Sequence, residues 1–512
     1  MNLIKLVINS NKLLRGIMIK NIFLTAVLSI FAMAGFAKEV SYSIDISSVN
    51  IKVEGKNLRA YRLNNTSPGP IIKANIGDTV KITFNNKTKN DTSIHWHGLL
   101  VPNNMDGVAG VTQSPIKAGG SFTYTIPVKQ TGTYWYHAHD LTEAEGVYGG
   151  IVLGDAGEDV SKENVLLYGG QLPEEAGNIL GRLQEGDMSI MHAAHHGGNA
   201  NSSNANNMMG NNDSNTCPVD GNSNASCSVG NNMGNMMGNG GGNTSNGRIG
   251  HFTDVVYAKH LINGSENPIT IKEIKDGKVK LRIVNTYVDG YLNFVYSGGK
   301  FNIAASDGLD VKPLAVDHLR VAMGETYDIV LTMPDKTKSY ELVAFFLGGS
   351  AYSKVLIGSG ALVPLKSYNY NDYNIDQVYN ELKTITPKFI QFDKFNGVEN
   401  HNFSLVGNHM RYNWEIQENG VKLNQLDVKV GDKIKVKITN NSSMPHPMHL
   451  HGHFFKVISA KNNLIKHTIN LDPNDSLEFE FIVDSEGKWS YHCHNLFHMA
   501  SGMMITLNAV KG

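Results

Sequence analysis

Half of the 20 histidines fall into four short clusters, and these are the side chains best suited to chemistry. Each cluster contains a His-x-His pair. Side chains two residues apart on a β-strand point to the same face, so each pair aims two imidazoles together. One such pair arises easily by chance, but four pairs, each at the end of a predicted strand, indicate metal binding. The pairs are His95/His97, His137/His139, His449/His451 and His492/His494.

Cys493 lies between two of these histidines and therefore points to the opposite face, toward a different metal. His498 and Met503 follow it at intervals of five residues. Together with His446 they supply two imidazoles, one thiolate and one weak thioether, which is the arrangement of a blue-copper electron-transfer site. Zinc is the competing metal, but four histidine pairs exceed what a closed tetrahedral zinc site needs.

The eight paired histidines divide equally between the N-terminal and C-terminal parts of the chain. They can hold one metal cluster only if these two parts face each other. Three coppers sharing eight imidazoles would deliver several electrons to one small molecule. The covalent path from Cys493 into either neighbouring histidine is one residue long, so it would connect a one-electron site to a multi-electron site.

Repeated strand patterns position these residues. Segments 77–85, 277–285 and 431–440 each read as a turn glycine, alternating apolar and polar residues, and a turn asparagine. The alternation predicts a half-buried antiparallel strand. In the first and third copies a further strand pair ends in histidines, whereas the middle copy has the strands without the histidines. We therefore predict an all-β protein of three related sandwich domains, with chemistry in the outer two.

The remaining segments set the expected boundaries. We predict a signal peptide at 1–37, domains at 38–156, 157–365 and 399–512, and a linker at 366–398. An insert at about 188–250 is rich in Asn, Gly and Ser and buries too little apolar surface to fold, so we expect it to be disordered. It carries seven of the 19 Met together with His192, His195 and His196.

The N-terminus is typical of an exported protein. Lys12, Arg15 and Lys20 precede an apolar run, and Gly35 and Ala37 suit cleavage. The alternative is a membrane anchor, but the run is short for a span and no later segment is long enough. Met18 is an alternative start. The formal net charge of -1 gives no electrostatic reason to expect nucleic acid or an anionic membrane as a partner. We expect a monomer in the periplasm.

These motifs resemble the multicopper oxidases, which couple one-electron oxidation of a substrate to four-electron reduction of O2. The resemblance implies three cupredoxin-like Greek-key domains and four copper ions, with a trinuclear cluster between domains 1 and 3. It assigns His446, Cys493, His498 and Met503 to the type 1 copper, and His95 and His449 to the type 2 copper. The type 3 pair would take His97, His137, His139, His451, His492 and His494.

Reduction of O2 to water consumes protons, so acids are expected near the cluster. Asp106 lies eleven residues after His95, where similar enzymes use an acid, although a turn aspartate explains it as well. Some relatives carry a second acid directly after the last type 1 histidine. Here that position is Met499, so Glu143 or Glu145 is the candidate substitute.

The sequence indicates the reducing substrate less clearly than it indicates the copper ligands. The segments 313–317, 324–330 and 491–504 look like the periplasmic copper-resistance branch, and Met444 lies where related cuprous oxidases place a thioether. We predict a cuprous oxidase for copper tolerance, with Cu(I) as the leading reductant and phenols or Fe(II) as others. The alternatives are a laccase-type phenol oxidase and a copper store or chaperone. Cys217 and Cys227 are expected to form a disulfide or to add thiolates to copper capture.

Overall fold

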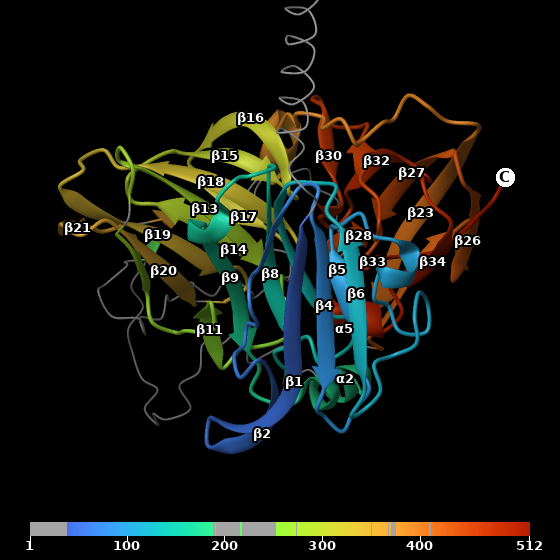
Figure 1. Cartoon of the computed structure of the whole chain (residues 1–512), viewed down its shortest axis with the longest axis horizontal. Helices are drawn as coiled ribbons and strands as arrows, with labels where there is room; N and C mark the ends of the chain where they lie inside the picture. The colour runs from blue at the N-terminus through green and yellow to red at the C-terminus, as the bar shows by residue number, and fades with distance from the viewer. Residues whose placement is uncertain are drawn as a thin grey trace, which may run out of the picture.

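The computed structural model describes residues 38–187, 190, 216–217, 252–272, 274–349, 351–366, 368–369, 375–408 and 411–512. The predicted signal peptide (1–37) and all but a few residues of the predicted insert (188–250) lie outside this set, as does Cys227 and with it the proposed disulfide. The fold is mostly β, as predicted, and its six larger sheets form three pairs along the chain (Figure 1).

The first domain packs two four-stranded sheets face to face around a shared apolar core. One sheet has the order β2 (Lys56–Leu63), β1 (Glu39–Val53), β4 (Thr79–Asn86) and β6 (Ser121–Pro127). The other has the order β3 (Ile72–Asn75), β8 (Tyr148–Gly154), β7 (Gly132–Ala138) and β5 (Ile94–His97).

The middle domain has two larger sheets. The order of one is β11 (Lys259–Ile262), β9 (Asn164–Gln171), β13 (Lys278–Asn285), β18 (Thr326–Thr332), β15 (Phe301–Ser306) and β16 (Leu309–Val316). The order of the other is β12 (Ile269–Ile271), β20 (Tyr352–Ile357), β19 (Lys338–Phe346), β14 (Leu292–Tyr296) and β17 (His318–Val321), with β21 (Ala361–Val363) beside β19.

The last domain repeats this plan. One sheet has the order β25 (Val421–Lys422), β24 (Asn413–Glu418), β23 (Val398–Asn408), β27 (Lys433–Asn440), β32 (Ser476–Ile482), β29 (Phe455–Val457) and β30 (Leu464–Lys466). The other has the order β26 (Gln425–Lys429), β34 (Met504–Val510), β33 (Gly487–Cys493), β28 (His446–Leu450) and β31 (Thr468–Leu471).

The other described elements are short. The helices are α2 (Ala176–Gln184), α4 (Ile375–Glu381), α5 (Leu496–Ala500), η1 (Asn103–Met105) and η2 (Val160–Lys162). The two-residue strand β10 (Thr216–Cys217) pairs with β22 (Tyr368–Asn369). None of the helices in the described ranges has the length and apolar character that a bilayer span requires.

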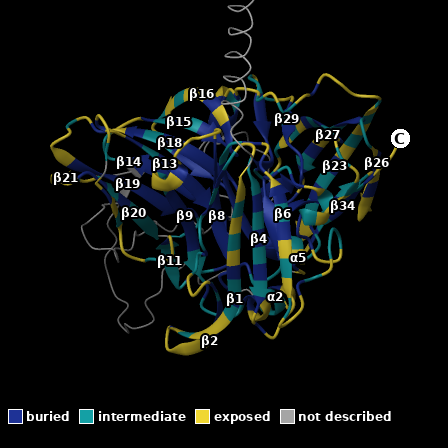
Figure 2. Ribbon diagram, viewed as in Figure 1, coloured by how far each residue is buried: buried dark blue, intermediate teal, exposed yellow. Residues whose placement is uncertain are grey.

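The three repeated sequence segments become the equivalent strands β4, β13 and β27. Each pairs antiparallel with a later strand, as predicted, but parallel with the first long strand of its own domain. The prediction of an antiparallel strand is therefore confirmed for one neighbour of each strand and wrong for the other, because alternation reports burial and not strand direction. Figure 2 shows buried residues concentrated between the sheets, whereas β1 and β2 carry exposed ones.

Two neighbouring strands carry the histidines in each outer domain. In the first domain β5 pairs with β7, which places His95 directly opposite His137. In the last domain β28 pairs with β33, which places His449 directly opposite His492. The same strand pairing in both outer domains thus presents two sets of four imidazoles.

Candidate metal centres

The eight paired histidines of the sequence come together in one group, buried except for the partly exposed His139, which we call the histidine cage. Nitrogen atoms within each of three triplets lie within 4.8 Å of one another, and every triplet mixes residues from the first and last domains. The triplets are His95/His97/His449, His97/His137/His494 and His139/His451/His492.

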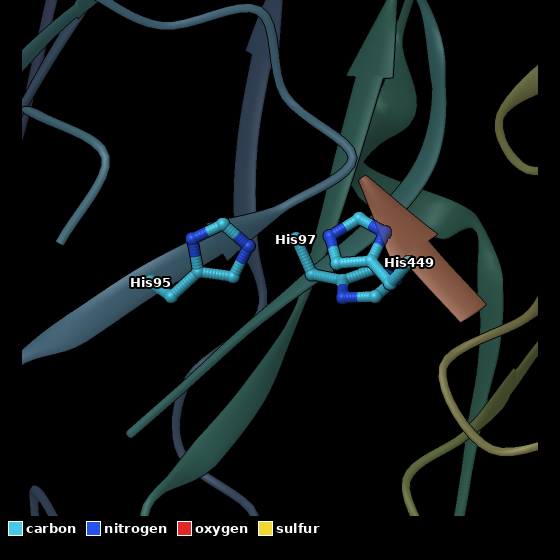
Figure 3. A group of neighbouring side chains, drawn as sticks. All are labelled: His95, His97 and His449. Carbon is cyan, nitrogen blue, oxygen red and sulfur yellow. The ribbon is translucent and has the colours of Figure 1, made fainter. Parts of the chain in front are cut away.

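Ring stacking joins the two domains inside the histidine cage. The ring centroids of His95 and His451 lie 3.7 Å apart at an interplanar angle of 21°. His97 and His449 stack in the same way, at 3.7 Å and 23°. Figure 3 shows the His449 ring lying over that of His97, with His95 to one side. One imidazole from each outer domain therefore contributes to each stack.

Burial lowers the pKa of several histidines of the histidine cage. Desolvation, followed by repulsion from neighbouring imidazoles, places the pKa values of His97, His449 and His451 well below the ordinary value. Burial likewise lowers the pKa of His492 to about 3. These imidazoles are neutral at physiological pH, and the neutral form is the one that binds a metal.

Asp106 lies against the histidine cage and contacts one histidine from each outer domain. Its Oδ2 is 3.0 Å from Nδ1 of His451, and its backbone carbonyl is 2.8 Å from Nδ1 of His95. The carboxylate is fully buried. The turn requires Gly107, which has φ 90°, because a Cβ there would lie 1.7 Å from the carbonyl oxygen of Ile94. The structure thus places Asp106 beside the histidine cage.

Glu143 is the other acid at the histidine cage. Its Oε2 lies 2.9 Å from Nδ1 of His137, and its side chain is buried. Glu145, the second residue considered from the sequence, instead lies 3.5 Å from Nε of Arg59. Of the two candidates, only Glu143 contacts a cage histidine in the structure.

A second group, the cysteine cluster, consists of His446, Cys493 and His498. The Sγ atom of Cys493 is 3.6 Å from Nδ1 of His446 and 3.7 Å from Nδ1 of His498. All three residues are fully buried, and burial raises the pKa of the Cys493 thiol. A thiolate at this place therefore needs a cation beside it. Met503 is buried as well, and its backbone N–H donates to the carbonyl of His498.

The cysteine cluster has supports that the sequence analysis missed. Oδ2 of Asp254 lies 3.0 Å from Nε2 of His498, and Oγ of Ser442 lies 2.7 Å from Nε2 of His446. The Trp414 ring packs on His498 at 4.0 Å between centroids. Ser442 lies only four residues before its partner, which is a usable local signal. Asp254 is 244 residues from His498, and no local pattern points to it.

Met444 lies in the segment leading to β28 and is 1% exposed. Its backbone carbonyl accepts hydrogen bonds from Nδ2 of Asn440 and Oγ of Ser442. The first of these distances is 2.7 Å and the second is 3.1 Å. The thioether is thus close to the cysteine cluster in sequence but covered in the structure.

Three sandwich domains with a cysteine cluster and a histidine cage define the class of multidomain cupredoxin oxidoreductases. The chain belongs to the multicopper oxidase family. Three family models, each described as multicopper oxidase, match residues 45–158, 230–361 and 391–512. The prediction from the sequence motifs is therefore confirmed at the level of the family, of the fold and of an oxidoreductase activity.

Relatives extend over nearly the whole chain. The multicopper oxidase MmcO of Mycobacterium tuberculosis is 27% identical, covering 92% of this chain and 88% of its own. Copper resistance protein A of Escherichia coli is 23% identical, covering 92% and 93%. The solved structure of Fet3p, described as a multicopper oxidase that functions in iron import, has a TM-score of 0.68 at 18% identity, covering 92% and 90%. At that identity it supports the fold alone.

Proposed function

We propose that the protein oxidises Cu(I) to Cu(II) and uses the electrons to reduce O2 to water. Four Cu(I), one O2 and four protons give four Cu(II) and two water molecules. The observation that carries the proposal is Cys493, whose thiol belongs to the cysteine cluster while its neighbours His492 and His494 belong to the histidine cage. The similarity to a copper resistance protein favours copper as the substrate.

The side chains present fit bound copper. His492 directs Nδ1 at the Cys493 carbonyl and His451 directs Nδ1 at the Asp106 carboxylate, so both Nδ1 atoms carry hydrogen. Their Nε2 atoms then face each other as lone pairs only 2.9 Å apart. A cation between them relieves this repulsion. Several other cage nitrogens are buried without a hydrogen-bond partner in the described ranges, among them Nε2 of His95, His137 and His449.

We assign His446, Cys493, His498 and Met503 to one type 1 copper. His95 and His449 would hold the type 2 copper, and the other six cage histidines the type 3 pair. Copper bound there supplies reversible one-electron transfer at the cysteine cluster and multi-electron chemistry at the histidine cage. Asp254, Ser442, Asp106 and Glu143 orient the imidazoles through their outer nitrogens.

Proton supply falls to the buried acids. Asp106 and Glu143 each contact a cage histidine, so each would hold a proton beside the histidine cage. Glu143 would supply the acid that some relatives carry directly after the last type 1 histidine, where this chain has Met499. We propose further that segment 1–37 directs export to the periplasm, where the enzyme protects the cell from copper.

The test measures copper content, absorption spectrum and oxygen uptake on the full chain. An oxidase binds four copper ions per chain, is blue, and consumes O2 with Cu(I) faster than with a phenol. Preference for the phenol would indicate a laccase-type enzyme. Copper binding without catalytic oxygen uptake would indicate a store or chaperone. Deleting residues 188–250 then asks whether the Met/His-rich insert contributes to Cu(I) use.

A further inference from the structure

The hydroxyl of Thr468 lies among three imidazoles beside the histidine cage. Its Oγ1 is 3.1 Å from Nε2 of His97, 3.1 Å from Nδ1 of His449 and 3.0 Å from Nδ1 of His467. Thr468 is the first residue of β31, it is fully buried, and it pairs directly with His449 across the sheet. One hydroxyl therefore contacts one cage histidine from each outer domain.

The two cage histidines meet this hydroxyl through different ring nitrogens. Nδ1 of His449 also lies 2.8 Å from the carbonyl of His467, and a carbonyl only accepts, so this nitrogen carries hydrogen. Its Nε2 is then the nitrogen left for a metal. For His97 the arrangement is reversed, because Nε2 faces Thr468 and Nδ1 is buried without a hydrogen-bond partner in the described ranges.

A hydrogen on Nδ1 of His97 would point into the histidine cage with no acceptor, which is costly for a buried N–H. The hydrogen therefore belongs on Nε2, where Thr468 Oγ1 accepts it. A hydroxyl has two lone pairs and one hydrogen, so it accepts from both cage histidines and donates to Nδ1 of His467. This assignment satisfies the three contacts of Thr468 but leaves the hydrogen on Nε2 of His467 buried without a hydrogen-bond partner in the described ranges, so it is favoured because a copper ion in the histidine cage needs the lone pair of Nδ1 of His97.

The middle domain holds Thr468 in place. Oδ2 of Asp307, just after β15, accepts the backbone N–H groups of Thr468 at 3.0 Å and of His467 at 3.1 Å. Its Oδ1 lies 3.3 Å from Nζ of Lys466, which also donates to Oε1 of Glu325 at 2.7 Å. All of these side chains are buried. Burial alone would lower the pKa of Lys466, but the two carboxylates outweigh it and raise the pKa, so the lysine stays charged.

We propose that Thr468 is a positioning residue that fixes His97 and His449 in opposite tautomers, and that the middle domain acts on the histidine cage through Asp307. This inference rests on the proposed copper binding of the cage. It gives the middle domain, none of whose described residues belongs to either proposed ligand set, a direct part in building the histidine cage.

The first test compares Thr468→Val with Thr468→Ser in the full chain. Valine keeps the shape and removes the hydroxyl, so cage copper should bind about 10–100-fold more weakly. The type 2 electron paramagnetic resonance signal should change while the blue absorption persists. Serine should restore wild-type copper content and signal. A packing role predicts the reverse, with valine tolerated and serine defective, and that outcome would overturn the proposal.

The second test uses Asp307→Asn, with Asp328→Asn as its matched control. Asp328 is also a buried carboxylate of the middle domain, but it contacts Arg282 and Thr133 and not the histidine cage. Both variants should lower the melting temperature, but only Asp307→Asn should weaken cage copper in a copper titration of the apoprotein. Equal copper affinity in the two variants contradicts the role of Asp307. A wild-type protein without four coppers would instead contradict the proposed function.

Discussion

The cysteine cluster and the histidine cage are built in different ways. The cysteine cluster belongs to the last domain alone, within the stretch from β28 to α5. Asn495 shapes its loop, because its side chain caps α5 and its backbone N–H lies 3.4 Å from Sγ of Cys493. The histidine cage takes four residues from each outer domain and exists only when these domains are docked. One centre thus depends on a local turn and the other on domain assembly.

The middle domain nevertheless supports both centres. Toward the cysteine cluster, Asp254 contacts Nε2 of His498, and Oδ1 of Asp289 accepts from Nδ2 of Asn495 at 2.8 Å. Toward the histidine cage, Asp307 accepts the backbone of Thr468. The proposed ligands therefore lie in the outer domains, whereas several of the carboxylates that contact them or their neighbours lie in the middle domain.

The largest expected effect comes from removing the thiol that joins the two centres. Cys493→Ser should abolish the blue absorption and oxygen uptake, because serine cannot replace a soft thiolate ligand to copper. The histidine cage should still bind three coppers, since its ligands are intact. Absorption spectra and copper analysis check this. Retained blue colour would rule out Cys493 as the type 1 ligand.

Asp106→Asn should affect the histidine cage alone. The amide keeps the shape but cannot carry the proton, so oxygen uptake should fall about 100-fold or more. Stopped-flow absorption locates the defect: substrate should bleach the blue centre at the normal rate, while O2 restores the colour slowly. Asp91→Asn, a change at an exposed ion pair with Lys117, is the control. Slow bleaching with fast recovery would show that Asp106 acts on the cysteine cluster and not on the histidine cage.

The residues that gather in the histidine cage and the cysteine cluster could be predicted from sequence because their spacing is local. Two-residue alternation on a strand fixes where His95 and His97 point, whatever the rest of the chain does. Asp106 was a candidate for a different reason, because similar enzymes use an acid eleven residues after the position of His95. The resemblance to a known family supplied the assignment of individual histidines, which spacing alone left open.

The orienting residues could not be predicted in this way. Thr468 and Asp307 are 161 residues apart, and Asp254 and His498 are 244 apart. Their contacts depend on how whole domains dock, and a single carboxylate in a strand or turn carries no periodic signal. The parallel partner of β4, β13 and β27 was missed because burial alternation is the same in parallel and antiparallel pairs.

A smaller effect, on the reduction potential, should come from changing Asp254, which contacts His498 of the cysteine cluster. Asp254→Asn removes the charge that makes His498 a more basic ligand, so it favours Cu(I) and raises the reduction potential of the blue centre. Tyr412→Phe removes the hydroxyl that donates to the same Oδ2 at 2.7 Å, which strengthens the bond to His498 and lowers the potential. A redox titration of the blue absorption measures both. Shifts of the same sign would contradict this coupling.

The smallest effect concerns substrate choice at Met444. Because the side chain is 1% exposed, alanine would leave a cavity, whereas Met444→Leu keeps the volume at a cost below about 1.5 kcal/mol. If the thioether passes Cu(I) to the cysteine cluster, leucine should slow Cu(I) oxidation a few-fold and leave phenol oxidation unchanged. Met333→Leu, at a buried methionine of the middle domain, controls for methionine loss in general. Equal losses of Cu(I) oxidation and phenol oxidation would show that Met444 only contributes to packing. Its thioether would then have no part in substrate choice at the cysteine cluster.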